Sequence, residues 1–63
     1  MKLIKLKNYR KNANPFYINP KNITSIQDCS TNDQTIVCIA FIGGGHASVG
    51  ETLEDVIRYI EMV

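Results

Sequence analysis

The stretch TIVCIAFI at residues 35–42 restricts the possible folds of this chain more than any other segment. Apart from Thr35, its even-numbered and odd-numbered residues are all apolar. Successive side chains of a strand point to opposite faces, so a half-buried strand carries a polar residue at every second position. An apolar run on both faces therefore predicts a β-strand that is covered on both sides.

A chain of 63 residues has little material with which to cover such a strand. It is near the lower size limit for folding alone, and we expect one domain over residues 1–63. Only one segment, close to the C-terminal end, has helical periodicity, and a single helix covers a single face. A second copy of the chain in a two-fold dimer is the simplest cover for the other face. The core or interface positions are Ile36, Val37, Cys38, Ile39, Ala40 and Phe41.

Three glycines and the only histidine follow directly, in the stretch FIGGGHASVGE. A phosphate-binding loop would end in Gly-Lys-Ser/Thr, whereas no lysine or arginine lies between Lys21 and Arg58. Residues 43–45 suit the positive φ angles of a hairpin turn, and the HASV that follows alternates like a strand. We therefore expect a hairpin turn, with His46 facing solvent rather than serving as a ligand or general base.

Shorter stretches with alternating or β-branched residues predict further strands, separated by clusters of turn residues. These strands are expected at residues 3–7, 16–18, 23–27 and 46–49. With residues 35–42 they form a small antiparallel sheet of four to five strands.

A helix is predicted from about Thr52 to Met62. Thr52 is suited to cap its first turn, with Asp55 three residues further on. The apolar residues at helical spacing are Leu53, Val56, Ile57 and Ile60. The predicted fold class is therefore α+β, with one C-terminal helix packed on the sheet.

The charges are segregated along the chain, although the net charge is only +1. Six of the seven cations precede residue 22, and all six acids follow residue 27. A basic N-terminal third can bind nucleic acid. The alternative, favoured by the alternation with apolar residues, is that lysines protect a sheet edge from pairing. The cations concerned are Lys2, Lys5, Lys7, Arg10, Lys11 and Lys21.

Catalytic chemistry has few candidates in this sequence. A hydrolase or transferase needs a nucleophile with a base, a carboxylate pair in a cleft, or a metal. The chain has one histidine, and its two cysteines, Cys29 and Cys38, lack the spacing of zinc ligands. A buried thiol at Cys38 serves as a small apolar side chain. We therefore expect no enzyme activity, no metal and no cofactor.

No stretch predicts export or a membrane span. The N-terminal residues alternate between charged and apolar, unlike the uninterrupted apolar run of a signal peptide. The longest apolar run, residues 36–42, is too short to cross a bilayer. We expect a cytoplasmic protein with no membrane partner.

Two stretches resemble the small FlbD-like family, known from flagellar operons and from related short phage and prophage proteins. They are FYINPKNITSIQD at residues 16–28 and IAFIGGGHASVGETLEDVIRYI at residues 39–60. The family pattern is an aromatic-bearing strand, Asn-Pro, a strand with Ile-x-x-Ile, and a hairpin leading into a Thr/Ser-x-Glu-Glu/Asp-Val-Ile helix. The resemblance implies a small antiparallel sheet with a C-terminal helix and brings no catalytic residues. The longer basic loop NYRKNANP departs from the family's short turn and favours a phage or prophage version.

The resulting prediction is a non-catalytic, homo-oligomeric protein-binding or regulatory module whose partner is a host or cellular protein. One alternative is nucleic-acid binding through the basic N-terminal third. The other is an oligomer that sequesters a small anionic ligand, because glycine amides can approach an anion closely. Its intersubunit pocket would be lined by Gly43, Gly44, Gly45 and His46.

Overall fold

The computed structural model of the protein describes residues 2–63 and has the α+β composition that the sequence predicts. Every predicted strand and the predicted helix are present at, or within two residues of, the expected positions. The elements are β1 (Ile4–Leu6), β2 (Phe16–Ile18), the short 3-10 helix η1 (Pro20–Asn22), β3 (Ile23–Asp28), β4 (Val37–Phe41), β5 (His46–Val49) and α1 (Leu53–Glu61).

The strands form two antiparallel sheets, which corrects the prediction of one sheet. β1 pairs with β2, and β4 lies between β3 and β5 in a separate three-stranded sheet. The short strands explain the division. β1 and β2 are three residues each, and the chain after β1 turns into a loop before it can form a full ladder with β5.

One close crossing joins the two sheets. Asn8, just after β1, forms a single bridge with Val49 of β5. Next to it the Gly50 amide donates to the Lys7 carbonyl at 2.8 Å. A Cβ on Gly50 would lie 3.0 Å from the Asn8 carbonyl oxygen and 3.2 Å from Tyr9 Cα, both backbone atoms. The absence of a side chain at Gly50 therefore permits this approach.

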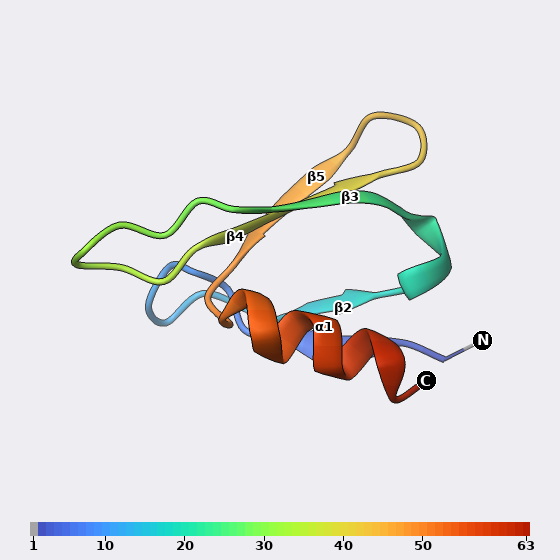
Figure 1. Cartoon of the computed structure of the whole chain (residues 1–63), viewed down its shortest axis with the longest axis horizontal. Helices are drawn as coiled ribbons and strands as arrows, with labels where there is room; N and C mark the ends of the chain where they lie inside the picture. The colour runs from blue at the N-terminus through green and yellow to red at the C-terminus, as the bar shows by residue number, and fades with distance from the viewer. Residues whose placement is uncertain (1) are drawn as a thin grey trace.

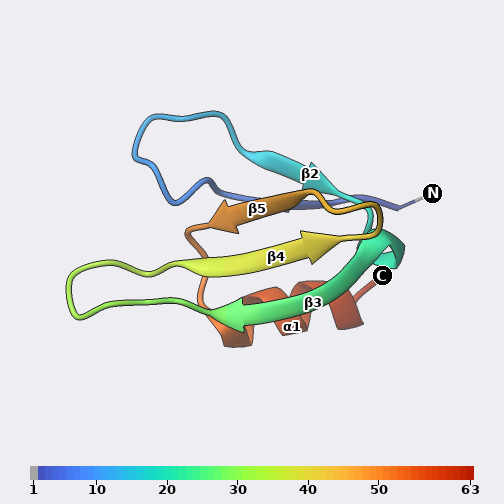
Figure 2. The same cartoon turned by 90° about the horizontal axis from the view of Figure 1, so that it is seen from above.

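The elements form two layers, which Figure 1 shows in profile: β3, β4 and β5 above, with α1 and the β1–β2 hairpin below. From above, α1 lies beneath the β3 side of the three-stranded sheet (Figure 2). The long β1–β2 and β3–β4 loops extend from one end of the molecule. The N- and C-terminal segments meet η1 at the other end (Figures 1 and 2).

The core fills the space between these layers. Val37 and Ile39 of β4 are fully buried and face Val56 of α1 and the β1–β2 hairpin. The buried cluster comprises Ile4, Leu6, Ile18, Val37, Ile39, Val49 and Val56. Burial of such side chains contributes about 1.5 to 3 kcal/mol each for the larger ones. The inner face of β4 is thus covered by the chain itself.

The helix begins as the sequence predicts. The Thr52 hydroxyl oxygen accepts a hydrogen bond from the Asp55 amide at 3.1 Å, so Thr52 is the N-cap. Asp55 also pairs with Arg58 one turn later, at 3.2 Å. Leu53 and Ile60 pack on the core, whereas Ile57 is 43% exposed at the flank of the apolar stripe. The stripe therefore covers the sheet with most, but not all, of its residues.

Candidate functional site

The glycine-rich segment is the turn between β4 and β5, as predicted. The Phe41 carbonyl accepts from the Gly44 amide at 3.1 Å, and Gly43 and Gly44 have φ angles of 94° and 100°. Such angles favour glycine over any residue with a side chain. No heavy atom lies within 4 Å of an added Cβ at either position, so the turn projects into open space. His46 follows it, exposed, at the first position of β5.

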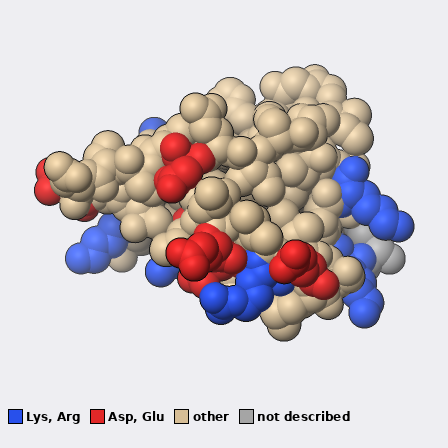
Figure 3. Space-filling model, viewed as in Figure 1, with Lys and Arg blue, Asp and Glu red and all other residues tan. Residues whose placement is uncertain are grey.

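The six predicted basic residues are all exposed but do not form one surface. Arg10 and Lys11 lie in the β1–β2 loop, whereas Lys21 belongs to η1 and Lys2 to the N-terminal segment, both at the opposite end. Figure 3 accordingly shows blue patches at both ends of the molecule. Lys5 is exposed on β1, and Lys7 follows that strand.

The aromatic ring nearest to the basic loop is already in contact with a cation. The guanidinium of Arg10 lies 5.5 Å from the centre of the Tyr9 ring, and its Nε donates to the Tyr9 hydroxyl at 3.0 Å. This hydrogen bond raises the pKa of Arg10 above its usual range. A nucleic-acid base would have to displace Arg10 before it could stack on Tyr9 from that side.

The two faces of β4 differ sharply. Val37 and Ile39 point into the core, whereas Cys38 and Ala40 are half-buried on the outer face. Of the other predicted core or interface residues, Ile36 and Phe41 are also half-buried. We expected both faces of this strand to be covered. A single chain covers the inner face fully and leaves the outer face half-buried.

The outer face of the three-stranded sheet is made of small and polar side chains around β4. Ala40 lies opposite Ser25 of β3 and His46 of β5. Cys38 lies opposite Gln27 and Ser48. The neighbouring Ile42, just beyond the strand, is 66% exposed. This face is less apolar than β4 alone suggests, because the neighbouring strands contribute mostly polar groups.

Two thiols lie next to each other on the outer face, which sequence reasoning did not predict. The Cys29 amide donates to the Ile36 carbonyl at 2.9 Å, so Cys29 continues the β3–β4 ladder and lies diagonally across from Cys38. A hydrogen bond with the Cys38 thiol raises the pKa of Cys29. Cys38 in turn lies 3.9 Å from the Ser48 hydroxyl. Both cysteines are free thiols.

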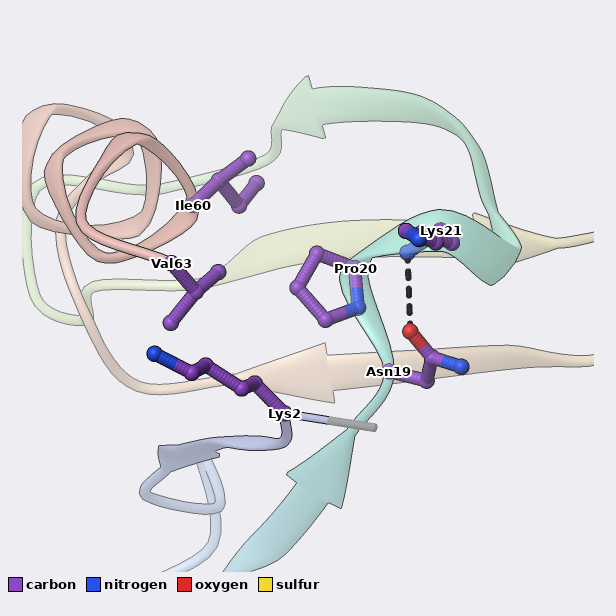
Figure 4. Close-up of a pocket in the computed structure, with 6 residues that line it drawn as sticks. All are labelled: Lys2, Asn19, Pro20, Lys21, Ile60 and Val63. Carbon is purple, nitrogen blue, oxygen red and sulfur yellow. Dashed lines mark hydrogen bonds between the residues drawn. The ribbon is translucent and has the colours of Figure 1, made fainter.

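A hollow of about 840 Å³ opens at the end where the terminal segments meet η1 (Figure 4). Its lining comes from three segments that are distant in sequence: the start of the chain, the β2–β3 connection and the end of α1 with the residues beyond it. The lining residues are Lys2, Asn19, Pro20, Lys21, Ile60 and Val63. None of the glycines of the β4–β5 turn is among them, so the hollow is not the glycine-lined pocket that the sequence suggested.

Local backbone structure fixes one wall of the hollow. Asn19 caps η1, with its side-chain oxygen accepting from the Lys21 amide at 3.1 Å, and Pro20 occupies the first position of η1. In Figure 4 the Pro20 ring faces Ile60 and Val63 across the hollow, and Lys2 runs along its rim. The sequence identified Lys2 and Lys21, but as nucleic-acid contacts. The sequence motif Asn-Pro-Lys-Asn predicted the turn that forms this wall.

Among residues 2–63, no group of three or more His, Cys, Asp or Glu side chains lies close enough to hold a metal ion. Over the same residues, no helix has the length and apolar character needed to cross a membrane.

No protein-family model matches the chain, and no significant match was found among curated proteins or solved structures. The likeness to the FlbD-like family therefore remains a prediction from the sequence.

Proposed function

We propose that the protein is a small non-catalytic binding module that acts as a homodimer and docks onto another protein. The observation that carries the proposal is the outer face of β4, which the chain leaves half-buried although its residues are apolar. Half-buried apolar side chains at the centre of a sheet face can be buried further by a partner, which stabilises association. A FlbD-like protein of a phage or prophage, acting on a host protein in the cytoplasm, is the setting that the sequence favours.

The small side chains of this face suit sheet-on-sheet packing. Cys38 and Ala40 allow a second sheet to approach closely, and Ser25 and Ser48 beside them can donate hydrogen bonds across an interface. Three strands about 4.8 Å apart and four to six residues long give a face of roughly 14 by 17 Å. This is small beside the ~800 Å² per partner of a standard interface. The dimer is therefore reversible rather than obligate.

A second feature supports docking onto a different protein. β3 has six residues, one edge paired with β4 and the other edge without a strand partner in the described chain. It contains neither lysine nor proline, the residues that commonly block edge pairing. An extended segment of a partner can add to such an edge as a further strand.

The non-catalytic part of the proposal rests on the environment of the reactive residues. His46 is exposed beside a hairpin turn and does not line the hollow. The raised pKa of Cys29 keeps this thiol protonated, whereas a nucleophilic cysteine needs a lowered pKa. The division of the cations between two ends also disfavours nucleic-acid binding as the main function.

Sedimentation equilibrium of the wild type and of Ala40→Asp tests the proposal. We expect a reversible monomer–dimer equilibrium for the wild type at tens of micromolar and a folded monomer for the variant. Asp at position 40 would lie opposite His46, so a single chain tolerates it. Ala13→Asp, the same substitution in the exposed β1–β2 loop, is the matched control and should dimerise like the wild type. A wild-type monomer at these concentrations would refute the proposal.

A further inference from the structure

The free edge of β3 lies above one flank of α1, on the side of the molecule away from the β1–β2 hairpin (Figures 1 and 2). The ladder with β4 shows which backbone groups this edge exposes. The Cys29 amide donates to the Ile36 carbonyl at 2.9 Å, on the β4 side. Alternate residues of an antiparallel strand direct their amide and carbonyl groups to the same side, so Gln27 also faces β4. Ile26 and Asp28 therefore present their backbone groups to the free edge.

The flank of α1 below this edge follows from the geometry of the helix. α1 is right-handed and advances about 100° per residue. It runs from left to right in Figure 1, with the three-stranded sheet above it. Val56 is fully buried toward the sheet, so Ile57 is turned toward the viewer, on the β3 side and away from the hairpin. Ile60, on the same flank, lines the hollow together with Lys21, which directly precedes β3 in the chain.

This flank carries one apolar side chain between two acids. Ile57 is 43% exposed, and Glu54 and Glu61 lie one turn before and one turn after it. Both acids are exposed, and the one ion pair among residues 2–63, Asp55 with Arg58, includes neither of them. Figure 3 shows the charged groups over α1, with largely uncharged surface above them at the level of β3. Two carboxylates thus remain for a partner.

We propose that this edge binds an extended segment of a partner protein with the pattern basic-x-apolar-x-basic, which adds to β3 as a further strand. The inference rests on the docking role proposed above for the β3 edge and defines the chemistry of the partner. Backbone hydrogen bonds to Ile26 and Asp28 hold the segment. Its first, third and fifth side chains face α1, because side chains of a strand alternate between faces.

The spacing of the acids fits this pattern. Glu54 and Glu61 are about 10 Å apart along the helix, and the two basic residues are about 13 Å apart along the strand. Lysine and arginine side chains are long and flexible enough to span the difference. The apolar residue between them packs on Ile57 and on Ile26, which is half-buried at the core side of β3.

A second copy of this chain is the alternative occupant of the edge, and its charge is wrong. Pairing β3 with itself brings in no cation, because Asp28 is the only charged residue of that strand. It would also bring the acids of two α1 helices toward each other, and like charges repel. A basic partner segment neutralises these acids instead.

Titration of ¹⁵N-labelled full-length protein with a capped peptide of sequence TKTVTKT tests the inference. We expect saturating amide shifts centred on residues 23–28 and on Ile57. The peptide TETVTET, with the same strand propensity and the opposite charge, should produce no saturating shifts there. The peptide TKTTTKT, which keeps the charges but lacks the central apolar residue, should bind more weakly.

Methylated peptides test the backbone pairing. One version of TKTVTKT carries N-methyl groups on its lysine and valine residues, and the other carries them on the two threonines beside the valine. Alternate amides of a strand point to opposite edges, so methyl groups in one version lie against β3 and in the other point away from it. One version should therefore lose binding and the other should retain it.

Matched charge variants of the protein give the quantitative arm. Glu61→Gln should weaken TKTVTKT binding about threefold, the effect of losing one exposed charge pair. Asp33→Asn, which removes the same charge from the β3–β4 loop, should leave binding unchanged. Both residues are exposed, so neither variant disturbs the core.

Three results would overturn the inference. They are equal binding of TETVTET, equal binding of the two methylated peptides, and equal affinities of the Glu61→Gln and Asp33→Asn variants. A fourth is concentration-dependent shifts of the Ile26 and Asp28 amides in Ala40→Asp without peptide, which would make a second copy the occupant. A dimer that binds no peptide contradicts this inference alone, whereas a wild-type monomer that binds TKTVTKT contradicts only the proposed dimer.

Discussion

The inner and outer faces of β4 look alike in sequence but differ in structure. Val37 and Ile39 are fully buried, whereas Cys38 and Ala40 on the opposite face are half-buried. The inner side chains are β-branched and meet the apolar residues of α1 and the β1–β2 hairpin. The outer ones are small, and the strands beside them carry serine, glutamine and histidine. Hydropathy thus predicts which strand is central, but side-chain size and cross-strand neighbours decide which face the chain covers.

The largest expected effect is the difference in stability between an aspartate on the inner face and an aspartate on the outer face. Ile39→Asp loses about 1.5 to 3 kcal/mol of burial and places a carboxylate in the core at a cost of several more. Because small domains have a total stability of only ~5 kcal/mol or slightly more, this variant should be unfolded. Ala40→Asp, one residue away, should retain the wild-type circular dichroism spectrum and thermal transition. Unfolding of both variants, or of neither, would contradict the assignment of the two faces.

The crossing between the two sheets is the next most sensitive position. Gly50→Ala places a methyl group against the Asn8 carbonyl and the Tyr9 Cα, at 3.0 and 3.2 Å. Such overpacking against backbone atoms should cost about 1 to 3 kcal/mol in the free energy of unfolding.

Gly45→Ala is the control for this effect, because the only atom near its added Cβ is Cδ2 of Phe41, at 3.9 Å. The control should shift the urea midpoint by much less. A Gly50→Ala variant as stable as the Gly45→Ala variant would mean that the two sheets do not approach as described.

Features of the fold that depend on residues close together in sequence could be predicted, whereas features that depend on distant residues could not. Strands, the Gly43–Gly44 turn and the Thr52 cap depend on neighbouring residues, and the sequence predicted them at their observed positions. The way the two sheets are joined depends on the contact of Gly50 with Asn8, residues 42 positions apart in the chain. No local pattern signals such a contact.

The hollow could not be predicted from the sequence either. Its walls come from Lys2, η1 and the end of α1, and only the folded chain brings these segments together. The sequence singled out the glycines and His46 because they are unusual in composition. The structure places them in an exposed turn, and none of them lines this hollow.

A smaller effect is expected from the thiols of the outer face. Because the Cys38 thiol raises the pKa of Cys29, less Cys29 is thiolate at a given pH, and its alkylation is slow. Cys38→Ala removes this neighbour, so the pH midpoint of Cys29 alkylation by iodoacetamide should move down. The comparison is made at submicromolar protein, where the monomer dominates. An unchanged or higher midpoint would show that the two side chains do not interact.

The three alanines of the chain provide the most direct test of the central claim, that the outer face of β4 is the self-association surface. Ala40 lies on that face, Ala47 is 5% exposed on the inner face, and Ala13 is exposed in the β1–β2 loop. In protein with ¹³C-labelled alanine methyl groups, dilution from millimolar to micromolar concentration should shift the Ala40 methyl signal and leave those of Ala13 and Ala47 unchanged. An Ala40 signal that stays constant over this range, or a shift centred on Ala13, would contradict the claim.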